Sequence, residues 1–463
     1  MNTYRSKADP FYPWLLFSAL ASTVFVTAWQ VNILSEVSGL ETLKAITAKN
    51  PLAVAMSFTF FILLAGRVWL AWRYTPYAPA NDRNLPLITV VIPAYNEGAQ
   101  VLHTVRSVMA SRYPKHKMKV ICVDDGSKDD TWSWMIKAKH QYGNRVQLIR
   151  QPINQGKRHA LMKGFQQAEG EVYVTIDSDS EVLPDTLRHL VSPIASDKNV
   201  GAVAGNVRVL NLADGAIPKM MEVTFTASFD FIRCGQSVYG GVFCTPGALS
   251  AYRASAISPH LATWLNQTFM GVPASIGEDR ALTNMVLGSG YRVVYQRDAV
   301  VLTKVPVSFE GLRRMLLRWG RSNIRENLVL LSYLWRPVRK GHGGMGWFRL
   351  YSSMEVFRMA VGEAFKVALL VQVLMAPFAM MTGLLFMCLT ASILPAVVHQ
   401  LRYGGWFGWR WAIAYSFFWL FGLAWISLWA LVTASKSAWL TRELRSVAKP
   451  SPQAAVMPPA SAS

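Results

Sequence analysis

Long stretches without charge constrain this chain more than any other feature of its sequence. Residues 11–35 contain no charged side chain, and about 20 consecutive apolar residues are enough to cross a bilayer as a helix. A cleaved signal peptide is disfavoured, because the stretch is too long and no small-residue cleavage site ends it. Residues 51–72 are interrupted only by Arg67, whose long side chain can reach the headgroups. We therefore predict two N-terminal membrane spans.

Two further apolar blocks follow near the C-terminus. Residues 367–399 are too long for one untilted span at about 1.5 Å per residue, and they contain Pro377 and Pro395, so they form either one tilted helix or a hairpin. Residues 403–435 carry Arg410 as their only charge and make another span. The segments that flank these spans are basic, which favours a cytosolic location for the N-terminus, the middle of the chain and the C-terminal tail.

The overall composition agrees with a membrane protein. Of the 463 residues, 52% are hydrophobic and 16% are charged, which excludes a disordered chain, collagen and a small disulfide scaffold. Lys and Arg number 47 against 27 Asp and Glu, and the net charge of +20 indicates an anionic partner: nucleic acid, an acidic membrane face or a phosphorylated substrate. The four cysteines lie far apart without a CxxC pair, so we predict reduced thiols and no zinc site.

Between about residues 73 and 349 the pattern changes to short β-rich runs that alternate with helical stretches. Such alternation predicts a mostly parallel, doubly wound α/β sheet, in which ligands bind outside the carboxyl ends of the strands. The predicted strands are residues 87–93, 120–123, 146–149 and 172–176, and one predicted helix covers residues 159–167.

Polar side chains follow three of these strands. They are Tyr95, Asn96 and Glu97 after the first strand, Asp124 and Asp125 after the second, and Asp177 and Asp179 after the fourth. Two carboxylates separated by one residue suit Mg²⁺ or Mn²⁺, although Asp also caps turns and helix starts. Residues 154–158 (NQGKR) supply a glycine and two cations at a helix start, which suits phosphate, with a solvated helix start as the alternative.

Six motifs in order carry a family resemblance. The chain resembles glycosyltransferase family 2 in six motifs, which are PAYNE (93–97), VDDGS (123–127), NQGKR (154–158), DSD (177–179), GEDR (277–280) and LRW (317–319). GEDRALT followed by LLRWGRSNIRENL is similar to membrane-embedded hyaluronan synthases and nodulation-type chitin-oligosaccharide synthases, and more distantly to cellulose synthases. The resemblance covers residues 86–334 and implies a glycosyltransferase-A-type cytosolic domain inserted between transmembrane helices.

The resemblance also implies roles for individual residues. A UDP-sugar donor, a divalent cation (Mg²⁺ or Mn²⁺) and a growing polysaccharide acceptor would share one site. The uridine would be held by Tyr95, Glu97 and Asp125, with Asp124 supporting that turn, and Lys157 would lie near the diphosphate or donor sugar. The metal motif would consist of Asp177 and Asp179, with Asp179 as the more direct ligand, and Asp279 would be the general base with Glu278 beside it. Finally, Arg318 and Trp319 would pack on the nucleotide and line the entry to the polymer channel.

The chain departs from the family pattern at one position. The glutamine of the QxxRW element should fall at residue 315, where this chain has Met315. Methionine lacks the amide that would grip the diphosphate or the acceptor. The preceding Arg314 could compensate, but it lies one residue off register, about 100° round a helix.

The segment 313–349 is strongly basic, with nine Lys and Arg against the single acid Glu326. Interleaved Leu and Trp favour helices that lie on an anionic membrane surface. We predict no nucleic-acid binding, because the segment adjoins transmembrane sequence and lacks a nucleic-acid module. We therefore expect five regions: 1–72 with two spans, 73–312 as the catalytic domain, 313–362 as basic interfacial helices, 363–435 with two or three spans, and 436–463 as a basic, then disordered tail.

These expectations converge on one functional hypothesis. The chain would be a multi-pass plasma-membrane protein with a cytosolic catalytic domain. It would act as a processive inverting glycosyltransferase that polymerises a β-linked polysaccharide from UDP-sugar and exports the polymer. The alternatives are transfer of one sugar to a lipid carrier, and a catalytically inactive membrane scaffold that only binds nucleotide. Neither the sugar nor the oligomeric state follows from the sequence.

Overall fold

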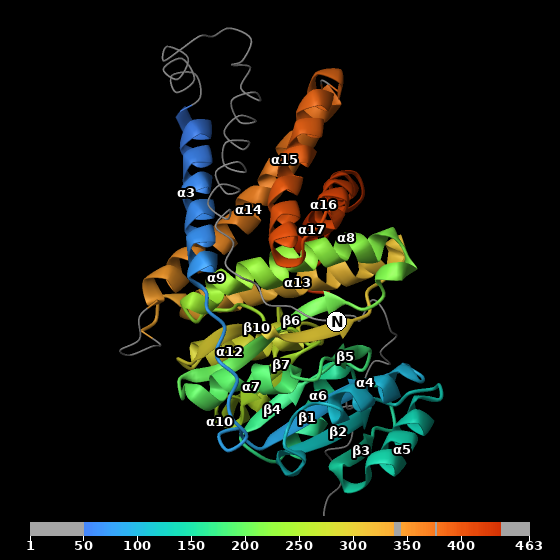
Figure 1. Cartoon of the computed structure of the whole chain (residues 1–463). Coiled ribbons are helices and arrows are strands. Elements are labelled where there is room, and N and C mark those ends of the chain that lie inside the picture. The colour runs from blue at the N-terminus through green and yellow to red at the C-terminus, as the bar shows by residue number, and fades with distance from the viewer. Residues whose placement is uncertain (1–50, 338–343, 376, 437–463) are drawn as a thin grey trace, which may run out of the picture.

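The computed structural model describes residues 51–337, 344–375 and 377–436, so the predicted span 11–35 and nearly all of the predicted tail 436–463 lie outside the described residues. An eight-stranded sheet with the order β3-β2-β1-β4-β7-β6-β10-β5 forms its centre (Figure 1). Four strands run parallel side by side: β1 (Ile88–Ala94), β2 (Met118–Asp124), β3 (Val146–Arg150) and β4 (Val172–Thr175). They are the four predicted strands, with ends shifted by one or two residues.

The other half of the sheet is mixed. β6 (Val200–Val209) runs parallel to β10 (Arg292–Thr303). β7 (Ser250–Arg253) lies antiparallel between β4 and β6, and β5 (Ser180–Val182) lies antiparallel on the outer edge of β10. The sheet is therefore mostly parallel, as predicted, and the two antiparallel strands are both short.

Helices bury both faces of the sheet, which explains why every residue of β1 is buried. Val90 and Ile92 belong to the core that also includes α4 (Gln100–Met109), α5 (Thr131–Tyr142) and α7 (Thr186–Ser196). Val91 points to the opposite core, with α6 (Lys157–Gln166) and α12 (Glu278–Gly288). The predicted helix 159–167 is α6, which begins two residues earlier.

A layer of helices separates the sheet from the apolar helices (Figure 1). It consists of α8 (Ala216–Phe225), a π-helical segment (Thr226–Phe231), α9 (Ile232–Val238) and α13 (Phe309–Leu334). α8 and α9 contact β6 and β10 on one side, while α8 and α13 contact α16 (Phe407–Phe418) and α17 (Trp425–Val432) on the other. This layer is where the polar domain and the apolar helices meet.

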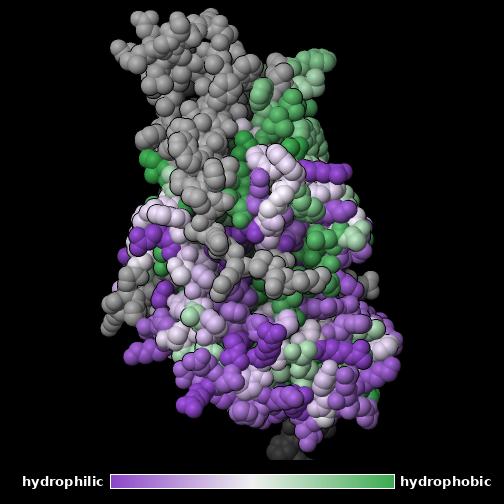
Figure 2. Space-filling view, in the orientation of Figure 1, coloured by the Kyte–Doolittle hydropathy of each residue, from purple (hydrophilic) through white to green (hydrophobic). Residues whose placement is uncertain are grey.

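The apolar helices protrude from one end of the molecule, and their surface is hydrophobic where the sheet domain is hydrophilic (Figure 2). They include α3 (Pro51–Arg73), which covers the predicted span 51–72, together with α14 (Met345–Met375) and α15 (Pro377–Tyr403). Within the predicted block 367–399, α14 ends at Met375 and α15 begins at Pro377, on either side of the one position in this block that the structure does not describe. The expected domain boundary at residue 362 falls inside α14.

Two segments in the described part of the chain are long and apolar enough to cross a membrane. One is Gly383–Tyr403 in α15. The other is a pair of helical pieces, Phe407–Leu423 and Trp425–Val432, that are bent by 44° and together match the predicted span 403–435. A π-helical turn (Trp419–Leu423) precedes the bend, and such turns are a recognised cause of helix kinks.

Candidate active site

A cavity of about 570 Å³ opens at the carboxyl ends of β1, β2 and β4. Segments from distant parts of the sequence line it: the loops after these strands, the starts of α6 and α12, one face of α13, and the loop before β7. Of the eleven site residues predicted from the sequence, ten line this cavity: Tyr95, Glu97, Asp125, Lys157, Asp177, Asp179, Glu278, Asp279, Arg318 and Trp319. Asp124 lies beneath it and is fully buried.

The loops after β1 and β2 are tied to each other. The backbone N–H of Asn96, a residue with positive φ (53°), donates to Ser127 Oγ at 3.0 Å, and the Lys128 N–H donates to Asn96 Oδ1 at 2.9 Å. Asp124 Oδ1 accepts from the Ser127 N–H at 2.9 Å. Gly126 has φ +72°, and a Cβ there would lie 2.6 Å from the Ile153 carbonyl carbon. The turn is therefore rigid and sterically closed to larger residues.

Asp125 organises the segment that the sequence suggested as a phosphate cradle. Its carboxylate accepts from Gln151 Nε2 (2.6 Å), the Gln155 N–H (2.9 Å) and the Gly156 N–H (2.8 Å). These backbone donors at the start of α6 are thus already used by a side chain of the protein. Neither of these two amides is therefore available to a phosphate. Arg158 also turns away, donating to the Trp264 carbonyl oxygen at 2.6 Å beneath α6.

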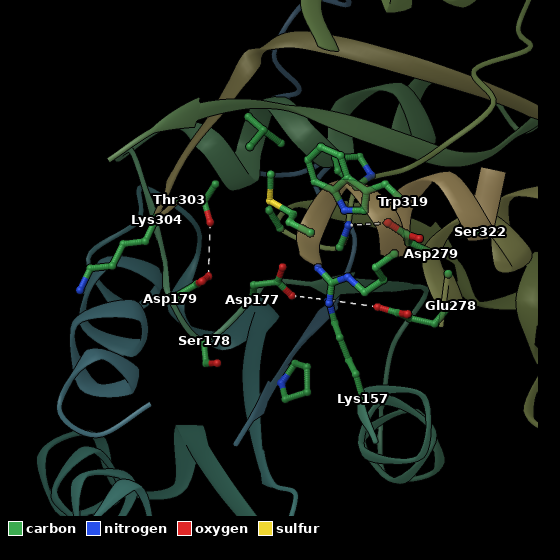
Figure 3. Close-up of a pocket in the computed structure, with 18 of the residues that line it drawn as sticks. Lys157, Asp177, Ser178, Asp179, Glu278, Asp279, Thr303, Lys304, Trp319 and Ser322 are labelled. Atoms are coloured by element: carbon green, nitrogen blue, oxygen red, sulfur yellow. Dashed lines mark hydrogen bonds and ion pairs between the residues drawn. The ribbon is translucent and has the colours of Figure 1, made fainter. Parts of the chain in front are cut away.

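Lys157 forms the centre of the site's ion pairs (Figure 3). Its Nζ lies 2.5 Å from Asp177 Oδ1 and 3.3 Å from Glu278 Oε1. Burial by itself lowers the pKa of Lys157, but the two carboxylates outweigh this and raise it above the usual lysine range. The same ammonium, with Arg318, keeps the pKa of the buried Glu278 below its usual value against the opposing effect of burial. A Cβ on Gly247 would overlap Lys157 Nζ, so a larger residue there would displace the ammonium.

Asp179 lies apart from this pairing and faces Thr303, whose hydroxyl donates to Oδ1 at 3.3 Å (Figure 3). The neighbouring Ser180 hydroxyl donates to the same oxygen at 3.2 Å. Burial, together with the charges of Asp177 and Glu97, raises the pKa of Asp179 to about 7. The region round Asp179 thus holds an excess of negative charge that a cation would relieve.

Asp279 occupies the second position of α12, two residues after Gly277, whose φ is +75°. Oδ2 accepts from the Gly247 N–H at 3.2 Å and lies 3.7 Å from Cys244 Sγ, while Oδ1 accepts from the Arg280 N–H at 2.7 Å. Burial and the adjacent charge of Glu278 raise the pKa of Asp279. Glu278 and Asp279 therefore diverge, Glu278 towards Lys157 and Asp279 towards the loop before β7.

The face of α13 that lines the cavity presents Met315, Arg318 and Trp319. Trp319 packs at ring-centroid distances of 5.9 Å from Phe229 and 6.2 Å from Phe225. Arg314 pairs with the exposed Glu310 at 2.7 Å and is absent from the lining. Arg314 therefore does not stand in for the amide that the family pattern places at residue 315.

Sequence reasoning assigned no role to three cations in the lining, Arg233, Arg280 and Lys304, or to the aromatic pair Phe225 and Phe229. Lys304 directly follows β10, so a prediction of that strand would have placed it at the polar edge of the sheet. Arg233 lies inside a helix in an apolar context, where no motif marks it.

The comparisons with known proteins agree with this geometry. Residues 89–261 match the family model of glycosyl transferase family 2. The chain carries a glycosyl transferase family 2 domain. It is 29% identical over 369 residues to an N-acetylglucosaminyltransferase of Rhizobium meliloti, covering 79% of this chain and 83% of that one. It is 33% identical over 279 residues to a hyaluronan synthase of Streptococcus pyogenes, covering 58% of this chain and 64% of the synthase.

Among solved structures, the chain is similar to a mannosyltransferase from Pyrobaculum calidifontis in complex with GDP-mannose and Mn²⁺. The TM-score is 0.44 at 20% identity, with 83% of this chain and 99% of that one covered. The family 2 domain and the relatives identify the activity class of this chain as glycosyl transfer.

Proposed function

We propose that this glycosyltransferase extends a β-linked polysaccharide from a UDP-sugar donor with inversion at the anomeric carbon, and that it exports the product across the plasma membrane. The observation that carries the proposal is the convergence of donor-side, metal-side and base-side groups from six separate segments in one cavity of about 570 Å³. A volume of that order suits a nucleotide-sugar and the end of an acceptor.

The donor end of the site is the loop pair after β1 and β2. Tyr95, Glu97 and Asp125 hold the uridine, while Asp124 keeps the turn closed from below. Because Asp125 already accepts three hydrogen bonds from the protein, it acts chiefly by fixing the shape of this subsite. Lys157 and Arg318 supply positive charge where the diphosphate departs.

The residues present fit a divalent cation, Mg²⁺ or Mn²⁺. In the described part of the chain, no three His, Cys, Asp or Glu side chains form a ready-made metal cage. Mg²⁺, however, is commonly held by one or two carboxylates and completes its shell with water and substrate phosphates. Asp177 and Asp179 supply such carboxylates, and the excess negative charge round Asp179 favours a cation there. When bound, the ion neutralises charge that develops on the leaving diphosphate.

Asp279 is the general base. Its carboxylate takes the proton of an acceptor hydroxyl while the hydroxyl oxygen bonds to the anomeric carbon and the bond from that carbon to the diphosphate breaks. A pKa above the ordinary aspartate value brings the base closer to neutral pH, where proton transfer is more effective. Glu278 holds Lys157 in place beside it at 3.3 Å.

Polymer extension and export are supported by the surroundings of the cavity. Its acceptor side is apolar and aromatic, with Phe225, Phe229 and Trp319, and the α13 helix that carries Trp319 contacts α17. A polymer end held against these rings lies next to the helices that are apolar enough to enter a membrane. The catalytic domain then faces the cytosol, the source of UDP-sugars.

The test is a donor screen on the purified full-length protein in detergent, with Mg²⁺ or Mn²⁺, that reads UDP release and product mass. We rank UDP-N-acetylglucosamine first, followed by its mixture with UDP-glucuronate and by UDP-glucose. A ladder or long polymer supports the proposal. A single organic-extractable product identifies transfer to a lipid carrier, and absence of turnover with every donor identifies a nucleotide-binding scaffold.

The test variant is Asp279→Asn, which replaces the proposed general base. The matched control is Asp185→Asn on the surface, where Asp185 pairs with Arg112 at 3.1 Å. Only the first is expected to lower turnover strongly.

A further inference from the structure

Arg233 is a buried cation that the roles above leave unused. It lies in α9, its residue is 5% exposed, and it lines the same cavity as Asp279 and Trp319. Its guanidinium carbon stands 4.4 Å from the centre of the Phe229 ring, which holds the side chain in one orientation. Phe229 in turn packs against Trp319.

One nitrogen of the Arg233 guanidinium has no hydrogen-bond partner within the described residues. Nη1 is buried without a hydrogen bond, and none of the ion pairs found in the described ranges involves this residue. The nearby Asp279 carboxylate makes its contacts with Gly247, Arg280 and Cys244 instead. Burying an N–H donor of a charged group without an acceptor is unfavourable, so we expect a bound ligand to supply the missing acceptor.

The position of Arg233 separates it from the donor. The groups assigned to the nucleotide and the metal come from the ends of β1, β2 and β4, whereas α9 belongs to the helix layer next to the apolar helices and contacts α3 (Figure 1). A group bound by Arg233 therefore lies in the cavity that Asp279 also lines, on the side of the helix layer.

We propose that Arg233 binds an anionic oxygen group of the acceptor, namely a uronate carboxylate of a glycan or the phosphate of a lipid-linked acceptor. This inference rests on the proposed function and specifies its acceptor. The planar guanidinium matches both groups, because it can donate two parallel N–H···O bonds to a carboxylate or a phosphate. Phe229 and Trp319 supply an apolar and aromatic surface for the adjoining sugar or lipid.

The experiment measures equilibrium binding to the full-length protein in detergent with UDP present. The probes are an oligosaccharide that ends in a uronate, the matched oligosaccharide that ends in glucose, and a polyprenyl phosphate. Wild type is expected to bind one anionic probe about tenfold or more tightly than the neutral oligosaccharide. The probe that is preferred identifies the source of the anionic group.

Arg233→Met is expected to remove the preference for the anionic probe. Arg233→Lys is expected to retain part of it, because lysine keeps the positive charge but lacks the two parallel N–H donors of the guanidinium. Arg112→Met, at an exposed arginine, is the control and is expected to bind like wild type. Unchanged affinity for UDP shows that each variant is folded. Equal binding of charged and neutral probes by wild type, or a preference that survives in Arg233→Met, would overturn the proposal.

Because binding is measured without turnover, this result is separate from the donor screen. A protein that turns over UDP-sugar but shows no preference for an anionic probe retains the proposed function and loses only the role of Arg233.

Discussion

Replacing Lys157 with methionine should destabilise the catalytic domain, because one ammonium neutralises two carboxylates there. Nζ lies 2.5 Å from Asp177 Oδ1 and 3.3 Å from Glu278 Oε1, and the side chains of Lys157 and Glu278 are only 16% and 10% exposed. Methionine has nearly the same length and keeps the packing, so the change removes mainly the charge. Asp177 and Glu278 then remain in the cavity wall without their shared counter-ion.

The size of the effect follows from these distances. At an effective dielectric constant of about 20, two unit charges 3.3 Å apart attract each other by about 5 kcal/mol, part of which is offset by desolvation. Leaving a buried partner unpaired costs about 3–5 kcal/mol. For a domain of this size, that corresponds to a fall of about 6–20 °C in the melting temperature. Adding Glu278→Gln removes one unpaired charge, so the double variant should melt above Lys157→Met alone.

The assay is the apparent melting temperature of the full-length protein in detergent, followed by tryptophan fluorescence. Lys119→Met is the matched control: Lys119 pairs with Glu169 at 2.8 Å, but Glu169 is 68% exposed, and such surface pairs contribute about 0–1 kcal/mol. The reasoning fails if Lys157→Met melts within about 2 °C of wild type. It also fails if Glu278→Gln lowers the melting temperature of Lys157→Met further.

Three more predictions concern the reaction. Asp279→Asn should lower the transfer rate by about 10²–10⁴-fold while leaving UDP affinity unchanged, and a parallel loss of UDP binding would contradict its role as base. Asp179→Ala should weaken metal-dependent UDP binding, measured by titration with and without Mn²⁺; equal affinities would refute that role. Because burial and Glu278 raise the pKa of Asp279, kcat should decline as pH falls through a value above the usual aspartate range of about 4. A pH–rate profile that stays flat down to pH 4 would exclude Asp279 as the titrating base.

The sequence by itself determined the sheet's first four strands and the motifs at their ends. The runs that became β1, β2 and β4 are largely apolar because helices cover both faces of the sheet, and such runs are visible without coordinates. Parallel strands bring their carboxyl ends to one edge. For this reason, the polar residues that follow them, such as Glu97, Asp125 and Asp177, could be expected to meet.

What the side chains do at that edge was decided by the tertiary structure. The sequence left open whether the helix start at residues 154–158 meets a phosphate or solvent; in the structure, Asp125 occupies the amides of Gln155 and Gly156. Arg314 was a candidate to replace a missing amide, yet it pairs with Glu310 outside the cavity.

Arg233 carries no motif and enters the site only because the α8–α9 layer folds across it. The local pattern of apolar and polar residues indicates which residues share a face or lie at the end of a strand, because such placement depends on neighbours a few positions away in the sequence. The choice of hydrogen-bond and ion-pair partners depends on contacts between residues tens to hundreds of positions apart in the sequence. Those contacts exist only once the chain has folded.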